Sequence, residues 1–195
     1  MMKTLRDTVT QRILDAAKEE FLRSNYAHAS MRAIAREAGM TVGNIYLYFP
    51  GKEQLFDAVV AAPLSQLSAL MRTPSASPES IRTLAEGLHE IFMRNRAEFL
   101  ILISRSEGSK YGDYRAMIVH FCRARLLEMS GGRGAGLYSA LSEAIIAGLL
   151  DIYHRFRGDG DALTRDLYAY LNYMLQGLSA PQAEEACPCA PSQKP

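Results

Sequence analysis

Apolar residues recur at helical spacing along most of the chain, and no segment alternates between apolar and polar residues with a period of two. From Asp7 to Arg23 they form one stripe on an amphipathic helix. Ser30 is a good N-cap for a shorter helix from Met31 to Ala38, whose small inward residues would let a neighbouring helix cross closely. The pattern therefore predicts an all-α fold without strands.

The stretch from Ala38 to Lys52 predicts a turn, a very short helix and the start of another helix. Gly39 suits the positive φ that ends the preceding helix, and Thr41 is an N-cap residue for a helix from Val42 to Phe49. A helix this short is stable only when it is docked on neighbours. Its outward face carries glycine, an amide and tyrosines instead of Lys and Glu, which indicates a contact surface.

The order of long helix, short helix, turn and short helix is that of a DNA-binding unit whose last helix reads the DNA. The alternative is a surface helix-turn-helix without a DNA role. From Lys52 to Leu70 a further helix would link this unit to the remainder of the chain, and Pro63 should break or bend it. A segment rich in Pro and Ser, residues 73–78, marks a boundary after that helix.

The C-terminal part predicts a second, larger helical domain. Its segment from Phe99 to Ile103 is apolar on every side and should be the most deeply buried helix. Two long helices, Leu137 to Phe156 and Ala162 to Leu178, carry apolar stripes that are wider than packing within one chain requires. We therefore expect this pair to form a four-helix bundle with a second copy, with Leu167 and Leu171 in the interface. Ala144 and Gly148 would let the two copies approach closely.

These elements divide the chain into three parts. We predict a helix-turn-helix domain at residues 1–60, a helical ligand-binding and dimerisation domain at 61–178, and a disordered tail at 179–195. The charged N-terminus has no apolar core, so we expect no signal peptide, and three cysteines in 195 residues fit a reducing cytoplasm. No apolar run is long enough for a membrane span. The net charge of +1 does not by itself indicate a nucleic-acid binder, so a DNA role must rest on the motif.

Catalytic and metal-binding motifs are missing from the sequence. It contains no phosphate loop, zinc-protease motif or serine nucleophile elbow, so we predict no enzyme, no cofactor and no metal site. His120 and Cys122 are two residues apart on a helix and cannot face one site. Cys187 and Cys189 have too few neighbouring ligands for zinc, and a redox role for the pair is the alternative.

Residues 7 to 60 resemble the DNA-binding domain of the TetR/AcrR family of transcriptional repressors. The similarity holds without a gap over the following residues: Ile13 to Ala17, Phe21, Ser30 to Ala35, Ala38 to Thr41, Gly43, Ile45, Tyr46, Tyr48, Phe49 and Lys52 to Leu55. Two positions depart from the family pattern: Tyr48 stands where histidine is common, and Asn44 where a small residue is common. The base preference of relatives therefore does not transfer.

The resemblance implies which residues contact DNA. Ser30, Thr41, Tyr46, Tyr48 and Lys52 would contact phosphates, and Lys52 also opens a helix, where the positive helix terminus favours an anion. Val42, Gly43 and Asn44 would face base edges, because a valine methyl can contact thymine and an Asn amide can pair with adenine. Packing against Phe21 is the alternative role for Tyr46.

Six residues of the second domain could line an apolar cavity with polar groups for a small effector: Phe99, Tyr111, Tyr114, Met117, Phe121 and Tyr138. Ordinary core packing is the alternative. We predict a homodimeric, cytoplasmic repressor that binds a near-palindromic operator and leaves it when an effector favours a different spacing of the recognition helices. The alternative is a helical small-molecule-binding protein or enzyme that retains a non-functional helix-turn-helix unit.

Overall fold

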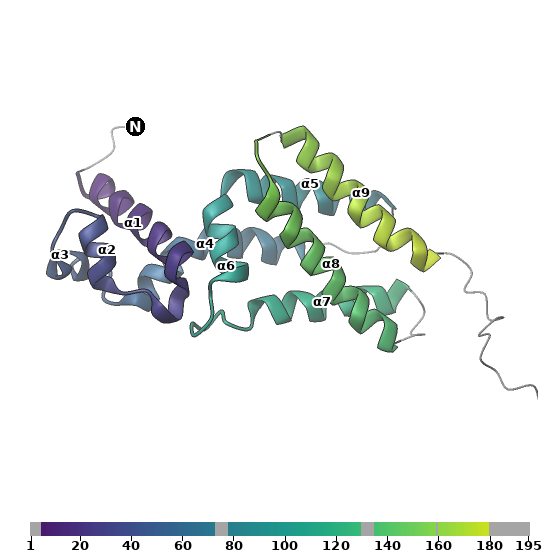
Figure 1. The fold of residues 1–195 in the computed structure, drawn as a ribbon, viewed down its shortest axis with the longest axis horizontal. Helices are drawn as coiled ribbons and strands as arrows, with labels where there is room; N and C mark the ends of the chain where they lie inside the picture. The colour runs from purple at the N-terminus through teal and green to yellow at the C-terminus, as the bar shows by residue number, and fades with distance from the viewer. Residues whose placement is uncertain (1–4, 73–77, 130–134, 159, 180–195) are drawn as a thin grey trace, which may run out of the picture.

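The computed structural model describes residues 5–72, 78–129, 135–158 and 160–179 of the chain (Figure 1). The described residues form nine helices and no strand, as the sequence pattern predicts. The helices are α1 (Leu5–His28), α2 (Met31–Glu37), α3 (Val42–Tyr46), α4 (Lys52–Leu70), α5 (Pro78–Arg94), α6 (Arg96–Ser104), α7 (Tyr114–Met129), α8 (Ala135–Arg155) and α9 (Gly160–Ser179). The predicted tail at 179–195 lies outside the described residues except for Ser179, the last residue of α9.

Helices α1 to α3 form one end of the molecule, with α3 far from α8 and α9 (Figure 1). Ile13, Phe21, Ile34 and Ile45 are completely buried and belong to the hydrophobic core that holds the three helices together. Helix α1 is longer than predicted and contains a kink at Asn25, where φ is 54° and ψ is 176°. Asparagine tolerates positive φ better than most residues, and its Oδ1 accepts the backbone N–H of His28 at 3.1 Å.

Helix α4 joins this end to the bundle and packs against α1, α5 and α6. Its bounds match the prediction. Pro63 was expected to break or bend the helix, but it does not break it, since the helix continues through a buried Pro63 to Leu70. Leu55, Phe56, Val59, Val60 and Leu67 are all buried along it. Packing on three neighbouring helices stabilises the helix against the loss of one backbone hydrogen bond. The domain boundary predicted between residues 60 and 61 therefore lies within a continuous helix.

Helices α5 to α9 form the bundle. Helix α5 packs against α9, α7 against α8, and α8 against α9, while α6 lies against α1 and α4 (Figure 1). Phe99, Ile101, Leu102 and Ile103 of α6 are all buried, which confirms the prediction that this short apolar segment lies deep in the fold.

Candidate functional site

The turn between α2 and α3 is built by side chains that cap both helices. Ser30 precedes α2 in extended conformation and its Oγ accepts the backbone N–H of Ala33 at 3.1 Å. Thr41 precedes α3 and its Oγ1 accepts the backbone N–H of Asn44 at 3.2 Å. Gly39 has φ of 65°, the left-handed conformation expected at the end of α2. The predicted local chemistry of this turn is therefore confirmed.

Helix α3 is shorter than predicted and presents a polar face to solvent. Ile45 is completely buried and fixes the helix on the core. Thr41, Gly43, Asn44 and Tyr46 are exposed, and Tyr46 does not pack on Phe21, whose ring instead lies 6.2 Å from that of Tyr26. The predicted phosphate and base contacts of these four residues are thus sterically open to a ligand that approaches this end of the molecule.

Val42, Tyr48 and Lys52 are only partly exposed. Val42 and Tyr48 are half-buried and pack against the core, so each offers only part of its side chain to solvent. Ser30, at the start of α2, is exposed. The predicted DNA-contacting residues therefore cluster on α3 and its two flanking turns, but they differ in how much of each side chain is free.

Lys52 has a structural role that the sequence did not predict. Its Nζ donates to the backbone carbonyl oxygens of Tyr26 at 2.7 Å, Ala29 at 3.1 Å and Ala27 at 3.4 Å. It also lies 4.5 Å from the centroid of the Tyr26 ring. An ammonium has three protons, so these carbonyls can use all of them. In this geometry the Lys52 ammonium is committed to the α1–α2 connector, residues 25–30, and the phosphate contact predicted for it would require the side chain to move.

A buried carboxylate on α1 orders the same connector. Glu20 is 4% exposed, accepts the backbone N–H of Ser30 on Oε1 at 3.2 Å, and forms an ion pair with Arg23 through Oε2. This places Ser30, and with it the start of α2, at a fixed position on α1. Sequence reasoning missed Glu20 because it read as one of the polar residues of an amphipathic helix, and only its partner ten residues along the chain explains its burial.

The segment between α6 and α7 contacts the helix-turn-helix end of the molecule. The backbone N–H of Tyr26 donates to the carbonyl oxygen of Arg105 at 2.8 Å. The Phe56 ring lies 6.1 Å from that of Tyr111, and Lys110 Nζ lies 2.7 Å from Asp57 Oδ2. The hydrogen bond to Asp57 raises the pKa of Lys110, while burial, and then the neighbouring Asp57 carboxylate, raises the pKa of Tyr111.

Helix α1 also contacts α6 through one ion pair. Lys18 Nζ lies 3.1 Å from Glu98 Oε1 and 2.8 Å from Asp15 Oδ1. Burial lowers the pKa of Lys18, but the two carboxylates outweigh that effect and raise it above its ordinary value. The first domain therefore contacts the second through ion pairs on both α1 and α4 and through the packing of Phe56 on Tyr111.

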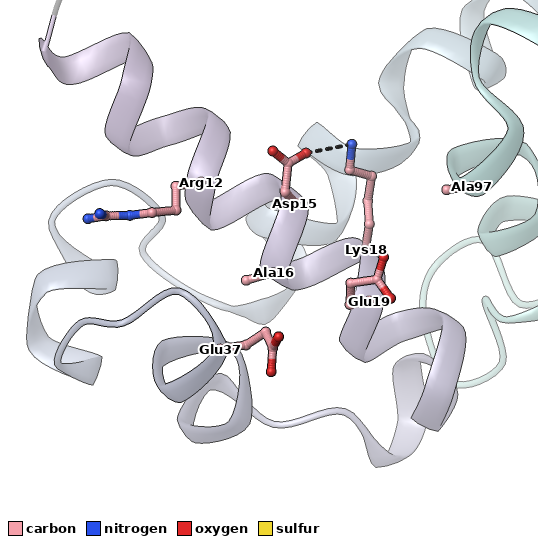
Figure 2. Close-up of a pocket in the computed structure, with 7 residues that line it drawn as sticks. All are labelled: Arg12, Asp15, Ala16, Lys18, Glu19, Glu37 and Ala97. Carbon is pink, nitrogen blue, oxygen red and sulfur yellow. Dashed lines mark ion pairs between the residues drawn. The ribbon is translucent and has the colours of Figure 1, made fainter.

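A pocket of about 390 Å³ lies beside this ion pair, between α1, α2 and α6 (Figure 2). It is lined by Arg12, Asp15, Ala16, Lys18, Glu19, Glu37 and Ala97. None of the six predicted effector residues lines it. Its lining mixes cations and carboxylates, and Lys18 is already paired with Asp15 in it, so it does not select one sign of charge.

The structure separates the six predicted effector residues. Phe99, Tyr114 and Tyr138 are buried, whereas Tyr111 packs on Phe56 at the contact between domains and Met117 is 46% exposed on α7. Phe121 is half-buried beneath the Arg125 guanidinium, which lies 5.3 Å from its ring centroid. Of the six, Tyr111 therefore belongs to the domain contact and Met117 to the surface.

An aromatic cluster in the bundle interior was not predicted as a unit. Tyr153 stacks on Phe92 at 4.3 Å between ring centroids and meets Phe99 edge-on at 5.0 Å, and Phe156 meets Phe92 at 5.7 Å. Tyr153 lies four residues after Leu149, a residue of the apolar stripe of α8, and this helical spacing was the signal available in the sequence. The hydroxyls of Tyr138 and Tyr153 are buried without a hydrogen-bond partner, and burial raises the pKa of Tyr153 far above its ordinary value.

Among the described residues, no group of three or more metal-ligating side chains is present. Cys122 is half-buried on α7, and burial raises its pKa to about 11. It is thus a protonated thiol at neutral pH. Cys187 and Cys189 lie outside the described residues.

The side chains predicted to form a dimer interface are buried within one chain, so this prediction was wrong for them. Leu167 is 0% exposed and Leu171 is 2% exposed, on a helix that packs against α5. The space beside Gly148 is also filled, because a Cβ there would clash with the ring of Tyr170, whose hydroxyl donates to Ala144 O at 2.7 Å. An apolar stripe shows that a side chain is buried but not by which chain.

A different face of α8 is open in the single chain. Four apolar residues on it are exposed at helical spacing: Leu137, Ala140, Ala144 and Ala147. Within the described part of the chain, the stretch Gly136–Arg155 is the one helix long and apolar enough for a membrane crossing by composition, and 33% of the apolar window in it is buried inside the chain. A helix that is so apolar and so little covered has a face that another molecule can bury.

Comparisons with known proteins converge on one group. Residues 13–59 match the family described as "Bacterial regulatory proteins, tetR family". The regulator UidR of Escherichia coli K12 is 27% identical over 121 residues, which cover 60% of this chain and 60% of UidR. The matched segment thus spans somewhat less than two thirds of that curated relative.

Two solved structures share the fold over most of their length. NalD of Pseudomonas aeruginosa, described as the secondary repressor of the MexAB-OprM multidrug efflux pump, is 25% identical with a TM-score of 0.55, covering 88% of this chain and 96% of NalD. A TetR-type regulator of Streptomyces coelicolor has a TM-score of 0.68 at 18% identity, covering 85% of this chain and 90% of its own.

Proposed function

Because the chain belongs to the TetR family of bacterial regulatory proteins, we propose that it is a DNA-binding transcriptional repressor. It acts as a homodimer on a near-palindromic operator and is released from it by a small-molecule effector. We place it in the cytoplasm, where its operator would be. The single observation that carries the proposal is the face of α3, where Ile45 is buried and Gly43, Asn44 and Tyr46 are exposed.

Polar residues on that face and on the turns beside it would make different contacts with DNA. Asn44 pairs with a base edge, because a side-chain amide can bind adenine bidentately in the major groove. Ser30, Thr41, Tyr46 and Tyr48 bind phosphates through their hydroxyls. The first turn of α4 can add backbone N–H groups to a phosphate, since Gly51, its N-cap, provides no side-chain cap.

Dimerisation uses the exposed face of α8 together with α9. The stripe Leu137, Ala140, Ala144 and Ala147 is open in one chain and small enough for two helices to approach closely. A two-fold contact there would fix the separation of two α3 helices at about one DNA turn, ~34 Å between half-sites.

The dimer is tested with a matched pair of variants. Ala147→Glu adds a charge to an exposed position, so we expect a folded monomer in sedimentation velocity and loss of operator binding. Leu167→Glu buries a charge inside one chain and should instead unfold it. A wild-type monomer, or a dimeric Ala147→Glu variant, would refute this interface.

DNA binding is tested by fluorescence anisotropy on the duplex upstream of the gene and on random duplexes over a range of salt concentrations. We expect tighter binding to the upstream duplex and a steep dependence of affinity on salt. The Asn44→Ala variant should cost ~1–3 kcal/mol on the operator and little on random DNA. Equal affinity for every duplex, without salt dependence, would favour the second candidate, a helical small-molecule-binding protein or enzyme with an idle helix-turn-helix unit.

The effector binds in the bundle of α5 to α9. Its interior contains the buried aromatic cluster around Phe92 and Tyr153, and buried tyrosine hydroxyls that lack partners, which are groups that an apolar ligand with an acceptor atom can satisfy. Release follows if the effector prefers a conformation in which the two α3 helices are wrongly spaced.

A further inference from the structure

Leu47 is the large hydrophobic residue that the helix-turn-helix face leaves most open. Its side chain is 77% exposed, against 48% for Tyr46 beside it. It is the C-cap of α3, with helical φ of −71° and ψ of −22°, so its direction follows the turn of the helix. Single exposed leucines are ordinary on protein surfaces. This one matters because of where it points.

The direction follows from Ile45, which is completely buried and defines the inward side of α3. At about 100° per residue, Gly43 and Leu47 each lie some 200° from Ile45, on opposite turns, and so share the outward side. Asn44 and Tyr46 lie about 100° to either side and flank them. Leu47 thus occupies the centre of the face that we propose to enter the major groove.

Gly43 leaves room for this side chain. A Cβ built on Gly43 would have only Thr41 Oγ1 near it, at 4.0 Å. Side chains on a helix lean toward its N-terminus, so Leu47 leans over the bare backbone of Gly43, one turn away. Leu47 therefore presents an isobutyl group flanked by the polar side chains of Asn44 and Tyr46. Val42 offers less apolar surface to DNA, because it is half-buried against the core.

The major-groove edges of the four base pairs offer one prominent apolar group, the C5-methyl of thymine. We propose that Leu47 reads a thymine in each half-site by packing against that methyl group, and that it contributes to operator specificity beside Asn44. The inference rests on the proposed function, and its partner is the pyrimidine 5-methyl group on duplex DNA.

The experiment begins with selection of duplexes from a random library by the wild-type protein. Each thymine of the selected half-site is then replaced by deoxyuridine, in both half-sites together, which removes the methyl group and leaves the base-pairing edges intact. We expect one symmetric pair of replacements to weaken wild-type binding about fourfold per half-site, or about 15-fold in all, from the loss of one buried methyl each.

The same duplexes are bound to Leu47→Ala. This variant should bind the thymine duplex more weakly than the wild type does, and its affinity should not change when deoxyuridine replaces that thymine. The effects of the protein change and the DNA change on binding free energy would then be non-additive, which shows that Leu47 and the methyl group interact. Because Leu47 is exposed, the variant should keep the wild-type circular dichroism spectrum and Tm. Met93→Ala, a truncation of an exposed apolar residue on α5, should leave both affinities unchanged.

Three results would overturn the inference while leaving the proposed function in place. Leu47→Ala could weaken binding equally on selected and random duplexes, which assigns Leu47 to the sugar–phosphate backbone. Deoxyuridine could weaken both proteins equally, which assigns the methyl contact to another residue. Leu47→Ala could also bind as the wild type does. Failure to recover any consensus with the wild-type protein would instead refute the proposed function, and this inference with it.

Discussion

Replacing Lys52 by methionine separates a structural role from a DNA contact. The substitution keeps most of the aliphatic stem and removes the ammonium that donates to Tyr26 O at 2.7 Å and Ala29 O at 3.1 Å. A hydrogen bond to a charged group contributes about 1.5–3 kcal/mol when its partner is buried. Lys52 and its connector are partly exposed, so water can replace the lost donors, and we expect a net loss of about 2 kcal/mol.

For a chain of this size, that loss lowers the Tm by roughly 4–8 °C. Thermal unfolding followed by circular dichroism measures it, and the salt dependence of binding to a random duplex is measured in parallel. If the ammonium stays on the connector in the complex, the salt slope of Lys52→Met should equal that of the wild type. A phosphate contact would instead lower the slope by about 0.9.

Lys110→Met is the matched control, because it also removes one positive charge but from the exposed ion pair with Asp57. Exposed ion pairs contribute little, so its Tm should change by much less than that of Lys52→Met. The structural reasoning is refuted if Lys52→Met unfolds at the wild-type temperature, or if its salt slope falls while that of Lys110→Met does not.

Three further outcomes are expected. Tyr153→Phe should leave the Tm unchanged or raise it, because the hydroxyl that is lost has no hydrogen-bond partner. Tyr170→Phe should lower the free energy of unfolding by about 1 kcal/mol, because the Tyr170 hydroxyl donates to Ala144 O. A fall in the Tm of Tyr153→Phe would show that its hydroxyl does have a partner. Cys122 should react slowly with iodoacetamide at pH 8 in the folded chain and rapidly in urea, because burial raises its pKa to about 11. The folded pKa of Cys122 exceeds the unfolded one, so its contribution to stability is complete below about pH 9 and is lost as the pH rises toward about 11. Urea titrations over this pH range should show the fall in the wild type but not in Cys122→Ala.

Local chemistry made much of the helix-turn-helix unit predictable. Ser30 and Thr41 cap their helices as their side chains suggest, and Gly39 takes the positive φ that its position required. These interactions join residues three or fewer apart, so the sequence displays both partners side by side. The start of α4 was predictable for the same reason, because the Pro50-Gly51 pair directly precedes it.

Contacts between distant residues were not predictable. The carbonyls that hold Lys52 lie 23 to 26 residues before it, and nothing in the pattern marks them as its partners. Leu167 and Leu171 show the same limit for apolar residues, because the helical stripe that predicts their burial is identical whether α5 or a second chain covers them. Pro63 differs again: the cost of a proline in a helix is local, but the packing that offsets it comes from three other helices.

These long-range contacts also bear on how an effector signal would reach α3. Helix α4 is one route, since it joins both domains. The α1–α2 connector is held from two sides, by Lys52 at the start of α4 and by the Arg105 carbonyl at the end of α6, which accepts the Tyr26 N–H at 2.8 Å. Ser30 ends that connector and caps α2, on which α3 rests. A displacement at the end of α6 would therefore move α2 through the Arg105 contact as well as through α4. A ligand that shifts only Arg105 or only Lys52 must either deform the other contact with the connector or move both together.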